Sequence, residues 1–256
     1  MFQPKTIIEP FRVKVVEPLP LLDRVDRAEA LQKADFNLFS VPAEKVTVDL
    51  MTDSGTSAMS QEQWAAIMRG DESYAGARSF FRFQKVLQDL TGMTHIIPTH
   101  QGRAAERILF HVAGGEGKKV PSNTHFDTTR ANVENSGAEA LDFVIPEGLD
   151  PQSIHPFKGN VDLVRLEQWL EVNHDDVPLF VLTVTNNSGG GQPVSLENMH
   201  GLKALLQKWE IPFFLDCARF AENAWFIHLR EPGQGSRSPR EISQEMFSLC
   251  DGAMMS

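Results

Sequence analysis

Asp216 and Arg219 are the residues whose types and spacing point most clearly to chemistry. They follow residues 211–215, an apolar run rich in bulky side chains that is typical of a buried strand. Such a strand would carry a carboxylate and, three residues later, a guanidinium to its C-terminal end. In open α/β sheets, ligands bind outside the carboxyl ends of the strands, so this pair could contact a ligand. A purely structural ion pair at a strand end is the alternative.

Three other predicted strands end in segments that could bind parts of a ligand. Residues 98–103 turn from a strand into a helix through Gly102, and the backbone N–H groups at a helix N-terminus bind phosphate. Residues 125–130 contain Phe126, which could stack on a planar ring. Asn187 lies just before three glycines, and its amide could bind a ligand. Each has a structural alternative, namely an ordinary strand-to-helix turn, core packing and the capping of turns.

The four strand ends together meet the requirements of one cofactor, pyridoxal phosphate. Its ring nitrogen needs a carboxylate to stay protonated, its phosphate needs backbone donors, and its ring needs a stacking surface. Each segment alone is weak support, whereas their order at successive strand ends is specific. We therefore predict a pyridoxal-phosphate site that is built from these strand ends.

The elements that must position these residues alternate between strands and helices. Strands are predicted at residues 46–50, 94–99, 120–123, 141–145, 179–184 and 211–216, and helices at 23–33, 61–68, 77–90, 102–113, 163–172 and 196–209. Helices of this length between strands imply right-handed crossovers and an α/β fold with a mainly parallel sheet covered on both faces. The proline-rich residues 1–45 are predicted to form an N-terminal arm, and residues 46–256 the cofactor-binding large domain.

Composition narrows the class of protein. With 256 residues, 41% of them hydrophobic and 23% charged, the chain can bury a sizeable core. The formal charge of −10 argues against a nucleic-acid-binding surface. Apolar runs are too short to span a membrane and no export signal is present, so a cytoplasmic location is expected. Two cysteines exclude a disulfide framework and a cysteine metal cluster.

Five segments of the sequence resemble the β-eliminating lyases, and the similarity runs along essentially the whole chain. These segments are residues 52–56, 70–76, 98–103, 190–195 and 216–224. The resemblance implies the aspartate-aminotransferase type of fold, which is fold type I among pyridoxal-phosphate enzymes. It also implies a homotetramer built from dimers, dependence on potassium, and cleavage of an aromatic amino acid into pyruvate, ammonia and either indole or phenol.

The resemblance assigns cofactor-binding roles to residues at the strand ends. Gln101, Gly102 and Ser256 would hold the phosphate, and Phe126 would stack on the pyridine ring. Asp216 would pair with the ring nitrogen, which makes it a catalytic residue as well as a cofactor ligand. The alternatives noted above for the individual segments remain open at this stage.

Further residues are assigned by the resemblance to the ring oxygen and the substrate. Arg219 would face the 3-oxygen of the cofactor ring, and Arg103 would support the network around the ring nitrogen. Asn187 would contact the substrate carboxylate or the same 3-oxygen, and Thr52 would contact the substrate.

The resemblance also implies roles in catalysis or cation binding for three residues between positions 55 and 74. Tyr74, the single tyrosine of the chain, resembles the family's proton donor to the leaving group, presented across a subunit contact. The carbonyl of Gly55 and the side chain of Glu72 resemble the potassium ligands, in keeping with the preference of hard cations for oxygen donors.

The choice of substrate is predicted from Asp127, which follows the stacking Phe126. The acid at this place resembles the members of the family that cleave tryptophan, whereas those that cleave tyrosine carry a threonine. A buried carboxylate selects an indole N–H strongly, because an analogue that lacks the donor leaves the acid unpaired. Asp127 could instead cap the following helix. We predict β-elimination of L-tryptophan to indole, pyruvate and ammonia, with cleavage of tyrosine as the alternative.

Residues 251–256 resemble the segment that in this family leads at once to the lysine forming the Schiff base with the cofactor, and later to a small domain. We therefore expect the chain to be a segment of a longer protein. If it ended at Ser256, a catalytically inert cofactor-binding or interaction domain would be the alternative. An aminotransferase or another carbon–carbon lyase is a closer rival, against which Tyr74, Gly55 and Glu72 argue.

Overall fold

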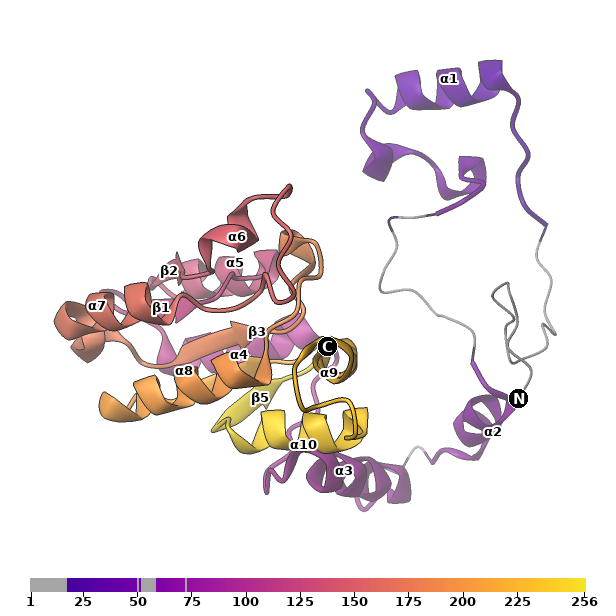
Figure 1. The fold of residues 1–256 in the computed structure, drawn as a ribbon. Coiled ribbons are helices and arrows are strands. Elements are labelled where there is room, and N and C mark those ends of the chain that lie inside the picture. The colour runs from indigo at the N-terminus through magenta and orange to yellow at the C-terminus, as the bar shows by residue number, and fades with distance from the viewer. Residues whose placement is uncertain (1–17, 50, 52–58, 72) are drawn as a thin grey trace. The chain divides into compact units, whose positions relative to one another are not determined.

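The computed structural model describes residues 18–49, 51, 59–71 and 73–256, and the chain divides into two compact units, residues 1–70 and 71–256 (Figure 1). Three of the predicted site residues, Thr52, Gly55 and Glu72, lie outside the described ranges. Their roles in substrate and potassium binding therefore stay predictions, as does the domain boundary after residue 45.

Short helices make up the described part of the first unit. The carboxylate of Asp23 accepts the backbone N–H of Asp26, and Ser60 forms a capping box with Gln63. These caps set the start of both α-helices, so the predicted helices at 23–33 and 61–68 are confirmed. The elements of this unit are α1 (Arg24–Lys33), α2 (Gln61–Arg69) and the 3-10 helices η1 (Leu38–Ser40) and η2 (Ala43–Lys45).

The second unit is built on a five-stranded sheet in which all neighbouring strands are parallel (Figure 1). This sheet confirms the predicted α/β fold and three of the predicted strand positions, whereas the strand predicted at 141–145 lies at 139–142. The crossovers between its strands contain helices, as the alternating pattern requires. In spatial order the strands are β2 (Glu139–Asp142), β1 (Lys119–Ser122), β3 (Phe180–Thr183), β4 (Phe213–Asp216) and β5 (Gly252–Met254).

Two helices cover one face of this sheet. Phe110 of α4 (Gly102–Ala113) and Val133 of α5 (Asp127–Asn135) share a buried core with Val181 of β3 and Met254 of β5. The predicted helix at 102–113 is confirmed. Helix α5 was expected only as the helix that follows Asp127, and its bounds were not predicted, because its sequence is mostly polar and only two of its residues are buried.

The opposite face is covered by four helices, around a larger core. Phe180 and Leu182 of β3 pack there with Phe213 and Leu215 of β4. Within the described residues, no helix combines the length and apolarity needed to cross a membrane. The covering helices are α7 (Leu163–Asn173), α8 (Leu196–Lys208), α9 (Phe220–Arg230) and α10 (Pro239–Ser248), and the connections contain α6 (Pro146–Leu149), η3 (His174–Asp176) and η4 (Asn187–Gly189).

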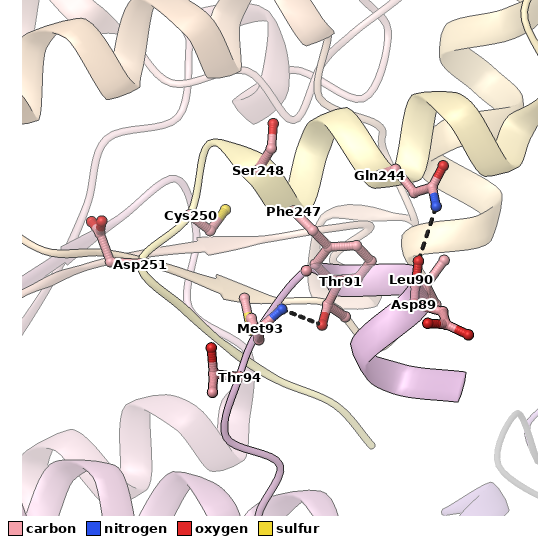
Figure 2. A pocket seen from close by; sticks show the side chains of 11 residues that line it. Asp89, Leu90, Thr91, Met93, Thr94, Gln244, Phe247, Ser248, Cys250 and Asp251 are labelled. Atoms are coloured by element: carbon pink, nitrogen blue, oxygen red, sulfur yellow. Dashed lines mark hydrogen bonds between the residues drawn. The ribbon is translucent and has the colours of Figure 1, made fainter. Parts of the chain in front are cut away.

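Helix α3 (Arg78–Thr91) packs against α10. It confirms the helix predicted at 77–90 and ends at Gly92, which adopts the left-handed conformation common at helix C-termini, with φ of 71°. The side-chain amide of Gln244 on α10 donates to the carbonyl oxygen of Asp89 on α3 at 3.0 Å (Figure 2). This contact fixes α3 to the helical layer that covers the sheet.

Two predicted strands are wrong. Residues 46–49 form no strand, and the N–H of Val46 donates to the carbonyl of Ala43 in the turn that ends η2. Residues 94–99 join none of the strands of the described sheet, although their apolar pattern resembles that of a strand. A strand is stable only when another strand pairs with it, and Pro98 has no N–H to offer to such a ladder.

Asn123 joins the ends of β1 and β3, where the backbone ladder between these strands is short. Its amide oxygen accepts the N–H of Thr183 at 3.0 Å, and its amide nitrogen donates to the carbonyl oxygens of Thr183 and Gly159 at 3.0 and 2.9 Å. The side chain is buried, so it replaces backbone pairing in a place without access to water. It therefore holds together the strand ends on which the predicted site depends.

We expect Asn123→Ala to lower the free energy of unfolding by about 3 kcal/mol, because it leaves buried backbone groups of Thr183 without partners. Chemical denaturation of the variant and of the wild type measures the difference. The exposed Asn135 provides a control, and Asn135→Ala should change the free energy by less than about 0.5 kcal/mol. Equal effects of the two substitutions would contradict the role of Asn123.

Candidate cofactor site

The carboxyl ends of β3, β4 and β5 place three side chains in one row. Thr183 pairs with Asp216, and Asp216 pairs with Met254, so the three residues are in register across the sheet. Register partners in neighbouring strands point to the same face, which here is the face covered by α4 and α5. As predicted, Asp216 ends its strand, and it lies at an edge of the sheet where α/β proteins bind ligands.

The N-terminus of α4 meets the end of the described chain at this edge. A Cβ atom placed on Gly102 would lie 2.7 Å from the Cβ and 2.9 Å from the Oγ of Ser256, so only glycine allows this approach. Gln101 precedes the helix with extended backbone, and its side chain makes no capping hydrogen bond. The structure thus brings Gln101, Gly102 and Ser256 together around a helix N-terminus, whose N–H groups and dipole favour an anion.

Glu106 faces Asp216 from α4 and was not predicted as a site residue. Its buried carboxylate accepts hydrogen bonds from Thr129 at 2.9 Å, Thr128 at 3.1 Å and Asn132 at 3.0 Å. The sequence contains a signal for Glu106. It lies four positions after Gly102 and therefore on the same face of the predicted helix, one turn closer to its C-terminus.

Burial and the nearby Glu106 carboxylate raise the pKa of Asp216 to about 6. The backbone N–H of Ala218, the Arg219 guanidinium and the Thr129 hydroxyl favour the charged form but do not outweigh these two effects. The hydroxyl of Thr129 has a single proton, so it can serve only one of the two carboxylates at a time. The site therefore favours a further positive charge beside Asp216.

A buried hydroxyl next to Asp216 also has no partner. Thr183 Oγ1 is buried and makes no hydrogen bond among the described residues. A protonated pyridine nitrogen would supply the positive charge that the site favours beside Asp216. The phosphate of the same molecule would bind at the helix N-terminus formed by Gly102 and Ser256. These residues consequently fit pyridoxal phosphate.

Arg219 connects the ends of β3 and β4. Its backbone N–H donates to the carbonyl of Val184 at 3.1 Å, and its Nη1 atom donates to the carbonyl of Thr185 at 3.4 Å. Its positive charge acts on Asp216, three residues earlier. The two residues of the predicted pair therefore lie at the end of a buried strand, where the charge of Arg219 favours the charged form of Asp216.

The loop after β3 carries Asn187 at the exposed start of η4. The neighbouring Asn186 is buried and ties the loop to the end of β1, because its amide donates to the carbonyl of Thr124 at 2.6 Å. Gly190 and Gly191 have φ of 81° and 68°, values that require glycine and explain two of the three glycines of this segment.

Phe126 precedes α5 and is half-buried. The residue before it, His125, is buried, and both its backbone N–H and its Nδ1 atom lie within hydrogen-bond distance of Asp142 Oδ1, at 3.0 and 2.8 Å. Arg130 donates to the other oxygen of Asp142 at 2.7 Å. This network fixes the backbone that carries Phe126 to the end of β2.

The sequence comparison now places the chain among known proteins. The family model described as β-eliminating lyase matches residues 49–256. The chain belongs to the β-eliminating lyase family. The tryptophanases of Rhodobacter capsulatus and Salinibacter ruber are each 58% identical to it over 98% of its length, which corresponds to 56% and 53% of those proteins. A tyrosine phenol-lyase of Symbiobacterium thermophilum is 43% identical over 97% of the chain and 54% of that protein. The chain spans about half the length of the curated relatives it matches.

Three of the predicted site residues lie apart from the row that contains Asp216. Arg103 is exposed, and no contact with Asp216 is present among the described residues. Tyr74 is fully exposed on the turn before α3. Asp127 is exposed as the first residue of α5, and its Oδ1 atom accepts the N–H of the adjacent Thr128 at 2.6 Å. The N-cap is Phe126, without a side-chain capping hydrogen bond, so Asp127 does not cap this helix as its alternative role supposed.

The raised pKa of Asp216 predicts a pH-dependent stability of the cofactor-free lyase. The folded state keeps a proton that the unfolded state loses between pH 3.8 and about 6, so stability falls as the pH rises through this window. We expect Asp216→Asn to remove up to about 3 kcal/mol of this loss, so the variant becomes progressively more stable than the wild type up to about pH 7, above which the difference stays constant.

Denaturation at several pH values measures this difference, and Asp142→Asn is a control of opposite sign. Burial alone would raise the pKa of Asp142, but the hydrogen bonds with His125 and the charges of His125 and Arg130 outweigh it and hold this pKa below its usual range. The wild type therefore gains stability as the pH rises through the lowered pKa to 3.8, whereas Asp142→Asn lacks this gain and falls below the wild type. A difference between Asp216→Asn and wild type that does not change with pH would contradict the raised pKa.

Proposed function

We propose that the intact protein cleaves L-tryptophan by pyridoxal-phosphate-dependent β-elimination to indole, pyruvate and ammonia. The observation that carries this proposal is the buried Asp216, whose pKa is raised to about 6 next to a glycine turn suited to a phosphate. Membership of the β-eliminating lyase family and the 58% identity to two tryptophanases support it.

Pyridoxal phosphate, when bound, supplies the electron sink that makes the substrate α-proton acidic. In the proposal, Asp216 holds the proton on the ring nitrogen, because a carboxylate beside this atom favours its charged form. Gln101, Gly102 and Ser256 bind the phosphate at the N-terminus of α4. Phe126 stacks on the ring and thereby orients it.

The remaining residues act on the ring oxygen and on the substrate. Arg219 faces the 3-oxygen of the ring and stabilises its negative charge. Asn187 binds the substrate carboxylate or the same oxygen, Thr52 contacts the substrate, and Arg103 supports the network around the ring nitrogen. What supports these roles is the resemblance of their segments to the family, together with the positions of Arg219 and Asn187 after adjacent strands.

Tyr74 is proposed as the proton donor to the leaving indole carbon. Gly55 and Glu72 are proposed as ligands of a potassium ion, which takes oxygen donors. A homotetramer built from dimers and a cytoplasmic location complete the proposal. Resemblance of the sequence to the family supports the roles of Tyr74, Gly55 and Glu72 and the tetramer, and the short apolar runs of the sequence support the location.

Tyrosine is the alternative substrate, and one observation favours it. Asp127 already accepts the N–H of Thr128, so its carboxylate is in part occupied at the helix start. The higher identity to the two tryptophanases, 58% against 43% for the tyrosine phenol-lyase, favours tryptophan. We infer that Asp127 keeps its second oxygen for the indole N–H.

The proposal is tested by measuring indole release from tryptophan and phenol release from tyrosine with the intact, cofactor-loaded protein. We expect indole release in excess, and a loss on the order of 10³-fold, equivalent to about 4 kcal/mol, in Asp216→Ala. The control variant Asp175→Ala changes an exposed aspartate that is not among the proposed site residues, and it should keep wild-type activity. Preferred phenol release would favour the alternative substrate, and release of neither product would contradict a lyase.

A further inference from the structure

A closed turn in front of α3 is held together by one side chain, that of Asp71. Its Oδ2 atom accepts the backbone N–H of Arg78 at 2.8 Å, and its Oδ1 atom accepts both the N–H of Ser79, at 3.0 Å, and the Ser79 hydroxyl. The N–H of Asp71 donates back to the Ser79 hydroxyl oxygen at 3.2 Å. Asp71 therefore joins the two ends of the turn and also caps α3, since Ala77 at the N-cap has no capping side chain.

The turn closed by Asp71 carries Tyr74, whose side chain has a relative exposure of 106%. Among the described residues, no hydrogen bond to the Tyr74 phenol is present. Within the described residues of one subunit, the location of this side chain therefore depends on the backbone of the turn. Gly76, with φ of 70°, provides the bend that brings the chain back to α3.

A continuous set of contacts links this turn to the body of the unit. Asp71 is bonded to the start of α3, and α3 packs on α10 with a hydrogen bond from Gln244 to Asp89 (Figure 2). Helix α10 in turn contributes Met246 and Phe247 to the core beneath the sheet. Asp71 therefore connects the turn that carries Tyr74 to the helices and the sheet of this unit.

We propose that Asp71 is a positioning residue that holds Tyr74 where its phenol donates a proton to the leaving group. The inference rests on the proposed function, in which Tyr74 is that donor. Proton transfer needs donor and acceptor within hydrogen-bond reach, and small displacements of a reacting group cost large factors in rate. A turn open at Asp71 would let the phenol sample many positions, of which few are productive.

The competing explanation is that Asp71 is only a helix cap. A cap stabilises the helix but has no preference for one step of a reaction. Asp162 gives a matched control, because its carboxylate accepts the N–H of Arg165 at 3.0 Å and caps α7, which carries none of the proposed site residues. Asp162→Ala should lower stability and leave turnover unchanged.

The experiment compares two substrates with the intact, cofactor-loaded protein. Tryptophan needs a proton on its leaving carbon, whereas an S-aryl cysteine releases a thiolate that needs none. We expect Asp71→Ala to lower kcat for tryptophan at least about tenfold, with KM and the turnover of the S-aryl cysteine changed less than about twofold. Asp71→Asn keeps one acceptor oxygen for Ser79, so it should restore part of the rate and serves if Asp71→Ala does not fold.

A double-mutant cycle with Tyr74→Phe tests whether Asp71 acts through the phenol. We expect the double variant Asp71→Ala/Tyr74→Phe to be no slower on tryptophan than Tyr74→Phe alone, because the phenol that Asp71 positions is already gone. Effects that multiply, or a loss in Asp71→Ala that is equal for both substrates, would overturn the proposal.

Chymotrypsin, which cleaves after aromatic residues in mobile segments, gives a readout independent of activity. We expect faster cleavage after Tyr74 in Asp71→Ala than in the wild type or in Asp162→Ala. Unchanged cleavage would contradict the claim that Asp71 keeps the turn closed. If Tyr74→Phe loses no more activity on tryptophan than on the S-aryl cysteine, the donor role of Tyr74 fails, and the proposed catalytic effect of Asp71 fails with it, even where the cleavage result stands.

Discussion

Asp216 and Glu106 place two carboxylates in the buried space between the end of β4 and helix α4. Like charges repel more strongly there than in water, and neither group can be moved into solvent without unfolding the layer. Glu106 is served by three donors from α5, whereas Asp216 shares Thr129 with it and depends on Ala218 and Arg219 for the rest. Asp216 therefore has too few donors and positive charges to stabilise its charged form, and a protonated pyridine ring beside it would supply the missing positive charge.

The rest of the unit holds this arrangement in place. The parallel sheet brings the ends of β3, β4 and β5 to one edge, and Asn123 joins β1 to β3 where the backbone ladder stops. Gly102 lets the start of α4, the positive end of the helix dipole, approach Ser256 closely. Glu106 lies one turn further along α4 and faces Asp216 at the end of β4, so the two carboxylates lie beyond the positive helix end. A cofactor with an anionic phosphate and a cationic ring matches this separation of charge.

The sequence predicted the helices and strands that are defined by local signals. Ser60 caps α2 and Gly92 ends α3, and the apolar run before Asp216 forms a buried strand. It failed where a partner decides the structure, because an apolar pattern at residues 94–99 cannot show whether another strand lies beside it. Helix α10 was missed although Ser238 and Glu241 form a capping box, a signal that could have found it.

For the site, Asp216, Arg219 and Gly102 could be placed from the ends of predicted elements, and Ser256 from the resemblance to the family. Glu106 was missed, although its spacing from Gly102 places it on the same face of the helix. Its importance comes from facing a carboxylate on another element, and such a relation depends on packing rather than on spacing along the chain. Asp127 shows the reverse limit, because its neighbour Thr128 uses the carboxylate that the pattern reserved for a ligand.

The protonation state of the bound ring nitrogen tests the central claim most directly. In the intact protein loaded with pyridoxal phosphate that carries ¹⁵N in the ring, the ¹⁵N chemical shift distinguishes pyridinium from pyridine. The account predicts a pyridinium shift that persists from about pH 6 to about pH 9 in the wild type and a pyridine shift near neutral pH in Asp216→Asn. An unprotonated ring nitrogen in the wild type, or the same shift in both proteins, would contradict it.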